Sequence, residues 1–181
     1  ACSVAIDDVR GGRLALDHLL DCHGSGVTMV NGSLSISQCG DRRDGARQAL
    51  TERGLDPDGM VEFAASDMAV EAGIAIGQSI VASGAPLRIF CANDQLALGV
   101  IRGLALGGVA VPDEACVVGY GDLALSAGGA LALTTVGQPK HELGELAVAR
   151  LIAELDEGPA HRHSVTVLEP RLIVRGSTVL R

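Results

Sequence analysis

The chain has 181 residues, of which 48% are hydrophobic, and a formal net charge of −8 at pH 7. That length suffices for one well-formed core, and the acidic balance argues against a nucleic-acid-binding surface within these residues. Glycines and charges interrupt the longest apolar stretches, which excludes a membrane-spanning segment within them. Because the chain has only two Phe, one Tyr and no Trp, its core must consist mainly of Ala, Val, Leu and Ile.

Short apolar runs alternate along the chain with longer helical patterns. The runs are typical of buried parallel strands, and the periodic segments are typical of helices. We expect strands at 4–6, 26–30, 60–64, 87–92, 115–120 and 133–136, and extended pieces at 165–168 and 171–174. We expect helices at 11–20, 40–53, 70–83, 94–107 and 139–156, with a loop or short helix in 123–132. The alternation predicts an α/β fold with a doubly wound, mostly parallel sheet.

The stretch 89–99 combines a strand, a polar turn and the start of a helix, with Asn93 or Asp94 as the helix cap. Ligands bind beyond the carboxyl ends of parallel strands, so Asn93 is a candidate binding residue. The helix 94–107 is apolar nearly all round, and after Asp94 at its start Arg102 is its lone charge. One sheet face needs only one apolar stripe, and we therefore expect a subunit interface on this helix.

Other polar side chains also follow the predicted strands. The candidates for ligand contact are Asp7, Asp8, Gln38, Arg42, Met68, Asn93, Asp122 and Gln138. The sequence has no phosphate loop, dinucleotide fingerprint or nucleophile elbow, so we expect no catalytic residue and no cofactor. Carboxylates, amides and an arginine suit reversible recognition of a hydroxylated small molecule.

The cysteines and histidines do not form a recognisable metal motif. The five cysteines, Cys2, Cys22, Cys39, Cys91 and Cys116, are scattered without a C-x-x-C pair. We expect reduced, mostly buried thiols in a cytoplasmic protein. His18 is expected to be an ordinary helix histidine. The segment of His161 and His163 contains no thiol or carboxylate, so we expect a solvated loop there and no metal.

Several stretches resemble, in order along the whole chain, the effector-binding domain of LacI-type (lactose-repressor) transcription regulators. They are residues 7–15 with 17–19, 32–34, 89–99, 111–113, 117–120, 133–136 with 138–139, and 175–178. The resemblance implies a two-lobed fold similar to periplasmic sugar-binding proteins (type I). It implies a homodimer that responds to a small-molecule effector, most commonly a sugar, with a nucleobase or nucleoside as another option. Operator DNA would be bound only through a DNA-binding head.

The resemblance also implies how the chain is divided. Residues 8–136 and 164–181 would form the C-terminal lobe, and the helix 139–157 would belong to the N-terminal lobe. The head, the hinge and about half of the N-terminal lobe would precede Ala1, since the chain opens there in the middle of an apolar run. The leucine stripe on the helix 139–157 would then pack on another copy of the chain or on the C-terminal lobe.

By position, the resemblance makes Arg42 the ligand-contacting arginine and Asn93 an amide that meets ligand hydroxyls. Gln38 and Gln138 would line the cleft, and Asp7 and Asp8 would lie at a crossover between the lobes. Met68 stands where many members have an aromatic ring. Gly121 stands where members usually have a ligand-binding aspartate. Either Asp122 takes over that contact, or the effector lacks the usual hydroxyl pattern, or ligand sensing is altered.

The leading interpretation is therefore effector sensing and dimerisation in a transcriptional repressor. An extracytoplasmic sugar-binding protein of a transport system shares the fold and stays open as an alternative. An α/β enzyme is the second alternative, although the sequence offers it no nucleophile, base or metal constellation.

Overall fold

The computed structural model describes residues 1–128 and 131–179. A six-stranded sheet of order β3-β2-β4-β5-β6-β8 forms the larger part of the molecule. Its strands are β2 (Thr28–Asn31), β3 (Val61–Ala64), β4 (Arg88–Cys91), β5 (Cys116–Gly121), β6 (Thr134–Gly137) and β8 (Arg171–Ile173). Neighbouring strands are parallel except β6 and β8. The predicted doubly wound, mostly parallel sheet is confirmed.

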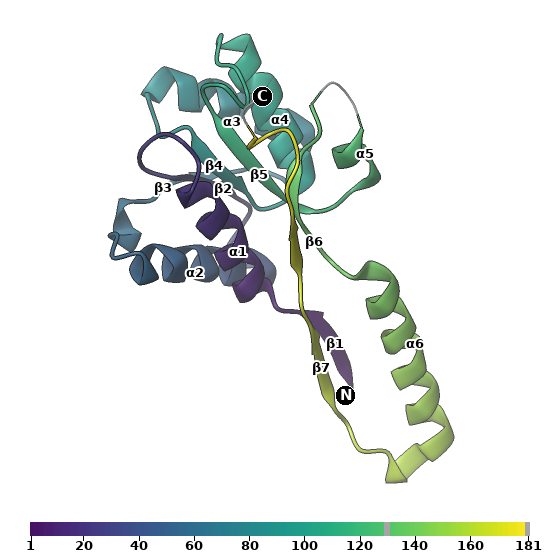
Figure 1. Ribbon diagram of the computed structural model, residues 1–181. Coiled ribbons are helices and arrows are strands. Elements are labelled where there is room, and N and C mark those ends of the chain that lie inside the picture. Colours follow the sequence, from purple (N-terminus) through teal and green to yellow (C-terminus); the bar gives the residue numbers. More distant parts are fainter. Residues whose placement is uncertain (129–130, 180–181) are drawn as a thin grey trace.

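Helices cover both faces of this sheet (Figure 1). The helices α1 (Asp8–Leu20) and α2 (Ser37–Glu52) pack on one face, and α3 (Val70–Ser83) and α4 (Asp94–Leu106) pack on the other. Smaller elements are η1 (Pro57–Gly59) and α5 (Ala124–Ala127). Because both faces are covered, β2, β4 and β6 are buried along their whole length and need apolar residues at successive positions. We call this unit the main lobe.

Glycines allow α3 and α4 to approach each other closely. A Cβ atom at Gly99 or Gly103 of α4 would collide with the carbonyl oxygen of Val70 or Ile74 of α3. The extra apolar surface of α4, which we expected to lie in a subunit interface, is thus covered largely by α3 of the same chain. Leu106, near the end of α4, stays exposed.

A narrow extension leaves the main lobe below α1 and β6 (Figure 1). It contains β1 (Ser3–Ile6), α6 (Lys140–Glu157), η2 (Gly158–Ala160) and β7 (Val165–Leu168), and β1 pairs with β7 in a separate parallel ribbon. We call it the stalk. The expectation that all of 164–181 lies in the larger unit was wrong, because β7 pairs with β1 and only the segment from β8 onward joins the main sheet.

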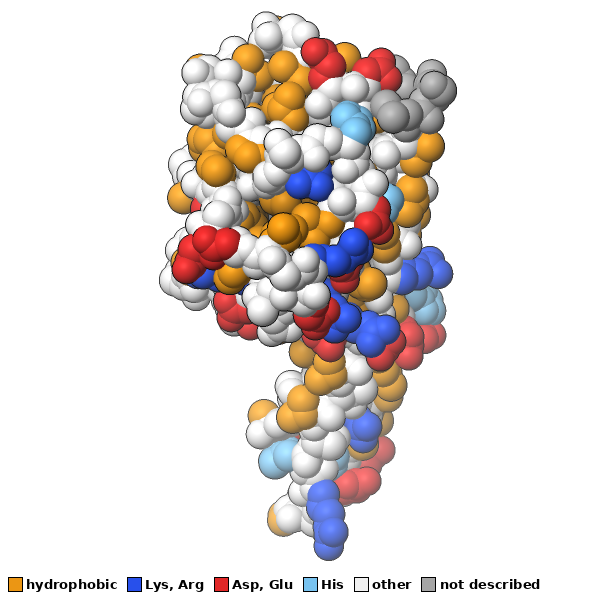
Figure 2. All heavy atoms as spheres, turned by 60° about the vertical axis from the view of Figure 1, so that its left-hand side comes forward, with side chains coloured by type: hydrophobic (Ala, Val, Ile, Leu, Met, Phe, Trp, Pro, Cys, Tyr) orange, Lys and Arg blue, Asp and Glu red, His pale blue; other side chains and the backbone are white. Residues whose placement is uncertain are grey.

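The helix α6 has no buried residue. Its side chains Val148, Leu151, Ile152 and Leu155 are exposed, and hydrophobic side chains line the narrow lower part of the molecule in Figure 2. Packing of the leucine stripe on the larger lobe, one of the two expected arrangements, was therefore wrong. The described helices include none that is long and apolar enough to span a bilayer.

Local capping fixes several helix boundaries. The side chain of Asn93 accepts a hydrogen bond from the Leu96 amide at 2.7 Å, which confirms the predicted cap of α4. Asp7 caps α1 in the same way through the Arg10 amide at 2.8 Å. For this reason α1 begins at Asp8, earlier than the predicted start at residue 11.

Candidate functional site

A cleft of about 360 Å³ lies where the main lobe meets the stalk. The strand order changes direction between β2 and β4, and ligands in such sheets bind at this switch point. The cleft draws residues from β1, the first turns of α1 and α2, and the start of α6. They are Val4, Ala5, Ile6, Asp8, Ser37, Gln38, Asp41, Arg42, Gln138, Lys140 and Leu143.

Arg42 is the best-positioned side chain in this cleft. Its Nε donates to Asp8 Oδ1 at 2.8 Å, and one terminal nitrogen donates to the Ala92 carbonyl at 2.6 Å. The guanidinium also lies 3.8 Å from the centre of the Tyr120 ring, a favourable cation–π distance. Of its five N–H donors, three have no partner within 1–128 and 131–179. Arg42 is thus held rigidly with donors to spare for a ligand.

Tyr120 forms the floor beneath Arg42. Burial, reinforced by the negative charge of Asp8, raises the pKa of the Tyr120 hydroxyl, so it stays protonated. This hydroxyl is buried and has no hydrogen-bond partner in the described part of the chain. The Tyr120 ring is 2% exposed and is not part of the cleft lining, so it supports Arg42 from beneath and does not replace the aromatic ring that the resemblance would place at Met68.

The two predicted glutamines reach the cleft from opposite sides. Gln38 lies in the first turn of α2, and Gln138 lies between β6 and α6. Asp41 and Lys140 also line the cleft, and the sequence did not single them out. Asp41 could have been found from its spacing, because it lies three residues after Gln38 and therefore on the same face of α2.

Asn93 and Met68 lie together at the same edge of the sheet. Asn93 Nδ2 donates to the Met68 carbonyl at 2.9 Å while its oxygen caps α4. Most of the hydrogen-bonding capacity of Asn93 is therefore used inside the protein, and one N–H remains. Neither residue is part of the cleft lining.

Asp7 and Asp122 are committed to other contacts. Asp7 caps α1 and does not line the cleft. Asp122 adopts a left-handed backbone conformation, and its carboxylate pairs with Arg175 at 2.7 Å. In this arrangement Asp122 does not take over the contact that Gly121 cannot make. Gly121 itself has a φ of 125°, which glycine adopts far more readily than aspartate does.

Asp94 is a buried residue whose role the sequence analysis did not identify. Its carboxylate is fully buried and accepts hydrogen bonds from Thr135 Oγ1 at 2.5 Å, Ser126 Oγ at 2.6 Å and the Leu123 amide at 2.7 Å. It therefore joins the start of α4 to β6 and to the loop after β5. No local sequence signal could have named these partners.

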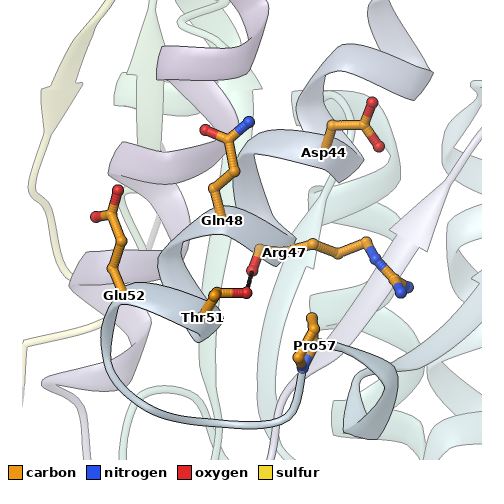
Figure 3. A pocket seen from close by; sticks show the side chains of 6 residues that line it. All are labelled: Asp44, Arg47, Gln48, Thr51, Glu52 and Pro57. Carbon is orange, nitrogen blue, oxygen red and sulfur yellow. Dashed lines mark hydrogen bonds between the residues drawn. The ribbon is translucent and has the colours of Figure 1, made fainter.

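A second concavity lies on the outer face of α2 (Figure 3) and is lined by Asp44, Arg47, Gln48, Thr51, Glu52 and Pro57. Arg47 is paired with Asp58 and Glu62. The concavity lies toward the carboxyl end of α2, away from the switch point, and it contains none of the predicted residues. We therefore place the candidate site in the cleft at the stalk.

The structure contradicts the expectation for His161 and agrees with the expectation for His18 as a helix histidine. His161 is not in a solvated loop, because its side chain is only 5% exposed and Cys2 Sγ lies 3.1 Å from its Nε2. His18 is half-buried, and it forms a hydrogen bond with Thr178 Oγ1 at 2.8 Å. All five cysteines are free thiols in the structure, as expected.

Comparison with known families settles which fold family this is. The periplasmic binding protein-like domain matches residues 3–178. The chain belongs to this family. Among curated proteins, it is 34% identical over 173 residues to the ribose operon repressor of Escherichia coli K12, and 32% identical over 174 residues to the HTH-type transcriptional repressor PurR of Photobacterium profundum. These alignments cover 94% and 93% of the chain and 52% and 50% of the relatives.

Solved structures give the same result for this periplasmic binding protein-like domain. A LacI-family regulator of Enterococcus faecium with bound ribose superposes with a TM-score of 0.91 at 28% identity, over 98% of this chain and 65% of that one. The lac repressor dimer bound to operator and an anti-inducer superposes with a TM-score of 0.86 at 28% identity, over 98% and 53%. The resemblance to LacI-type effector-binding domains is thus confirmed. The chain spans about half the length of the curated relatives it matches.

Proposed function

We propose that the chain is the effector-sensing and dimerisation part of a LacI-type transcriptional repressor, and that the effector binds in the cleft between main lobe and stalk. The observation that carries this proposal is the cleft itself, which gathers Asp8, Gln38, Arg42 and Gln138 at the switch point of the sheet. The matched relatives are transcriptional regulators, which favours a repressor over a sugar-binding protein of a transport system.

A sugar is the effector that suits this lining. Carboxylates, side-chain amides and a guanidinium pair well with hydroxyl groups, and a few polar groups in a cleft of this size are typical of small-molecule sites. Arg42 is preorganised by Asp8 and the Ala92 carbonyl, so little side-chain entropy is lost when a ligand binds. A pentose such as ribose, which is bound in the structural relative from Enterococcus faecium, is the first candidate.

Effector binding would act through the relative position of main lobe and stalk. Three chain connections join main lobe and stalk: β1 to α1, β6 to α6, and β7 to β8. A ligand that contacts both Gln38 of the main lobe and Gln138 at the stalk would favour a closed arrangement of the two. That is a population shift between two states. In this proposal the main lobe corresponds to the C-terminal lobe, the stalk contributes to the N-terminal lobe, and a separate head binds operator DNA in the cytoplasm.

A surface for dimerisation lies beside α4. An apolar groove there is lined by Val70, Leu98, Ala124, Leu125, Gly128 and Leu131. Leu125 is mostly exposed, although an isolated chain gains nothing from exposing it. We assign this groove to a second copy of the chain, because the lac repressor structure that superposes on this chain is a dimer.

The test is calorimetric titration of the complete protein with ribose, together with a thermal-shift panel of other sugars and nucleosides. A ligand that binds only the folded state raises the unfolding temperature. Gln38→Ala should weaken ribose binding about three- to tenfold, the equivalent of one net hydrogen bond. Gln48→Ala, on the outer face of the same helix, is the matched control and should leave affinity unchanged. Equal effects of the two variants, or no stabilisation by any compound, would contradict the proposal.

A further inference from the structure

Four metal-ligating side chains meet at the far end of the stalk. Cys2 immediately precedes β1, Glu154 lies in the last turns of α6, and His161 and His163 lie between η2 and β7. One donor atom from each residue lies within 4.8 Å of the others. Cys2 and His161 are separated by 159 positions in the sequence, so only the pairing of β1 with β7 brings them together.

The distances approach those of a tetrahedral site. Cys2 Sγ lies 3.1 Å from His161 Nε2 and 3.9 Å from His163 Nδ1, and Glu154 Oε2 lies 3.9 Å from His163 Nδ1. Four ligands at the usual zinc bond lengths are separated by roughly 3.3–3.8 Å along the edges of the tetrahedron. These three contacts lie within a few tenths of an ångström of that range, and all donor pairs of the cluster lie within 4.8 Å.

The backbone accounts for the orientation of the two histidines. His161 has extended dihedral angles, and residues two apart in an extended segment point to the same side. The Ser3 amide donates a hydrogen bond to the Ser164 carbonyl at 3.1 Å. This bond extends the β1–β7 ribbon by one residue, to Ser164, which directly follows His163. The thiol of the preceding Cys2 therefore faces both rings.

An outer carboxylate holds the more buried ring in place. His161 Nδ1 lies 2.8 Å from Glu157 Oε2, one turn of helix from Glu154. A hydrogen bond from Nδ1 to a carboxylate leaves Nε2 free as a ligand and is the usual outer partner of a metal-bound histidine.

We propose that Cys2, Glu154, His161 and His163 form a structural Zn²⁺ site that fastens the end of α6 to the β1–β7 ribbon. A thiolate and two imidazoles favour Zn²⁺ over Mg²⁺ or Ca²⁺, which prefer oxygen ligands only. Four protein ligands leave no open position for a reacting water, which makes the site structural. Such a site would fix the end of α6, which buries no side chain within the described residues, to the β1–β7 ribbon.

The first test titrates the reduced, metal-free full chain with Co²⁺ and then displaces it with Zn²⁺. One equivalent of Co²⁺ should give the intense visible bands of tetrahedral coordination and a thiolate-to-cobalt charge-transfer band, and Zn²⁺ should abolish both. Zn²⁺ should also raise the unfolding temperature. Octahedral, weakly coloured Co²⁺ without a charge-transfer band would overturn the proposal.

Variants assign the bands to this cluster. Cys2→Ser should remove the charge-transfer band, and His163→Ala, the most exposed ligand, should weaken Zn²⁺ binding by tenfold or more. Glu157→Gln should weaken it roughly 10- to 100-fold without loss of the charge-transfer band. His141→Ala, an exposed histidine of the same helix α6, and Cys22→Ser are the controls and should bind as the parent does.

Circular dichroism shows whether each variant is folded, so loss of binding can be separated from loss of structure. Retention of the charge-transfer band in Cys2→Ser, or its loss in Cys22→Ser, would overturn the assignment. A Cys2 thiol that is alkylated equally fast with and without Zn²⁺ would also overturn it, since that result indicates a thiolate–imidazole pair without metal.

Discussion

The main lobe and the stalk differ in how much apolar surface they bury. The main lobe buries apolar side chains on both faces of its sheet, in one cluster under α1 and α2 and another under α3 and α4. The stalk has only a two-stranded ribbon and one helix, and its apolar side chains face outward (Figure 2). Two-stranded ribbons are marginally stable by themselves. The difference shows that the stalk depends on contacts beyond those of the ribbon and α6, whereas the main lobe does not.

The comparison also applies to polar groups. In the main lobe the buried carboxylate of Asp94 accepts three hydrogen bonds, and Arg42 is fixed by Asp8 and the Ala92 carbonyl while keeping donors for a ligand. In the stalk the Cys2, His161 and His163 donors are close but incompletely bonded to one another. In the stalk, incompletely bonded polar groups and uncovered apolar surface lie together, and a partner that binds there would stabilise the folded stalk.

The largest contrast is expected between two leucines. Leu104→Ala in α4 removes a fully buried side chain and should lower the free energy of unfolding by about 3 kcal/mol, because a cavity remains. Leu155→Ala in α6, where the side chain is 74% exposed, should change it by less than about 0.5 kcal/mol. Urea denaturation of the purified chain measures both. A large loss in Leu155→Ala together with a lower solution mass would show that another copy covers the stripe.

Two helix glycines give the next contrast. Gly99→Ala in α4 places a methyl group against the Val70 carbonyl and should destabilise the protein by about 2 kcal/mol. Gly144→Ala in α6, where nothing lies within 4 Å of the new atom, should stabilise it by about 0.5–1 kcal/mol through helix propensity. The thermal unfolding midpoints of the two variants should shift in opposite directions. A destabilising Gly144→Ala would mean that the stalk is more closely packed than a single chain shows.

The smallest effect concerns pH. Burial lowers the pKa of His18 below its usual value, and Asp21 opposes this only in part. The stability that the neutral ring contributes is complete above the unfolded-state pKa of about 6.5, and it is lost as pH falls through that value toward the folded-state pKa. His18→Asn should remove this dependence. The difference in unfolding free energy between parent and variant, followed from pH 8 to pH 5, measures it, and a difference that grows in favour of the parent at low pH would contradict the sign.

Local sequence patterns determined the elements and their order. The apolar runs and helical periodicity placed every strand of the six-stranded sheet to within a few residues, and α3 begins and ends where predicted. The sequence left Asn93 and Asp94 as candidates for the cap of α4, and the hydrogen bond from the Leu96 amide shows that Asn93 is the cap. The row of polar residues at strand ends also followed from sequence, since the carboxyl ends of parallel strands share one edge.

Only the tertiary structure decided which of these residues act together. Arg42 rests on Tyr120 and bonds to Asp8, Asp94 joins three segments, and Cys2 meets His161 from the other end of the chain. Each contact depends on strand pairing between distant segments, which hydrophobic periodicity does not encode. The sequence therefore specified where polar groups could gather, and the packing of main lobe and stalk selected the ones that do.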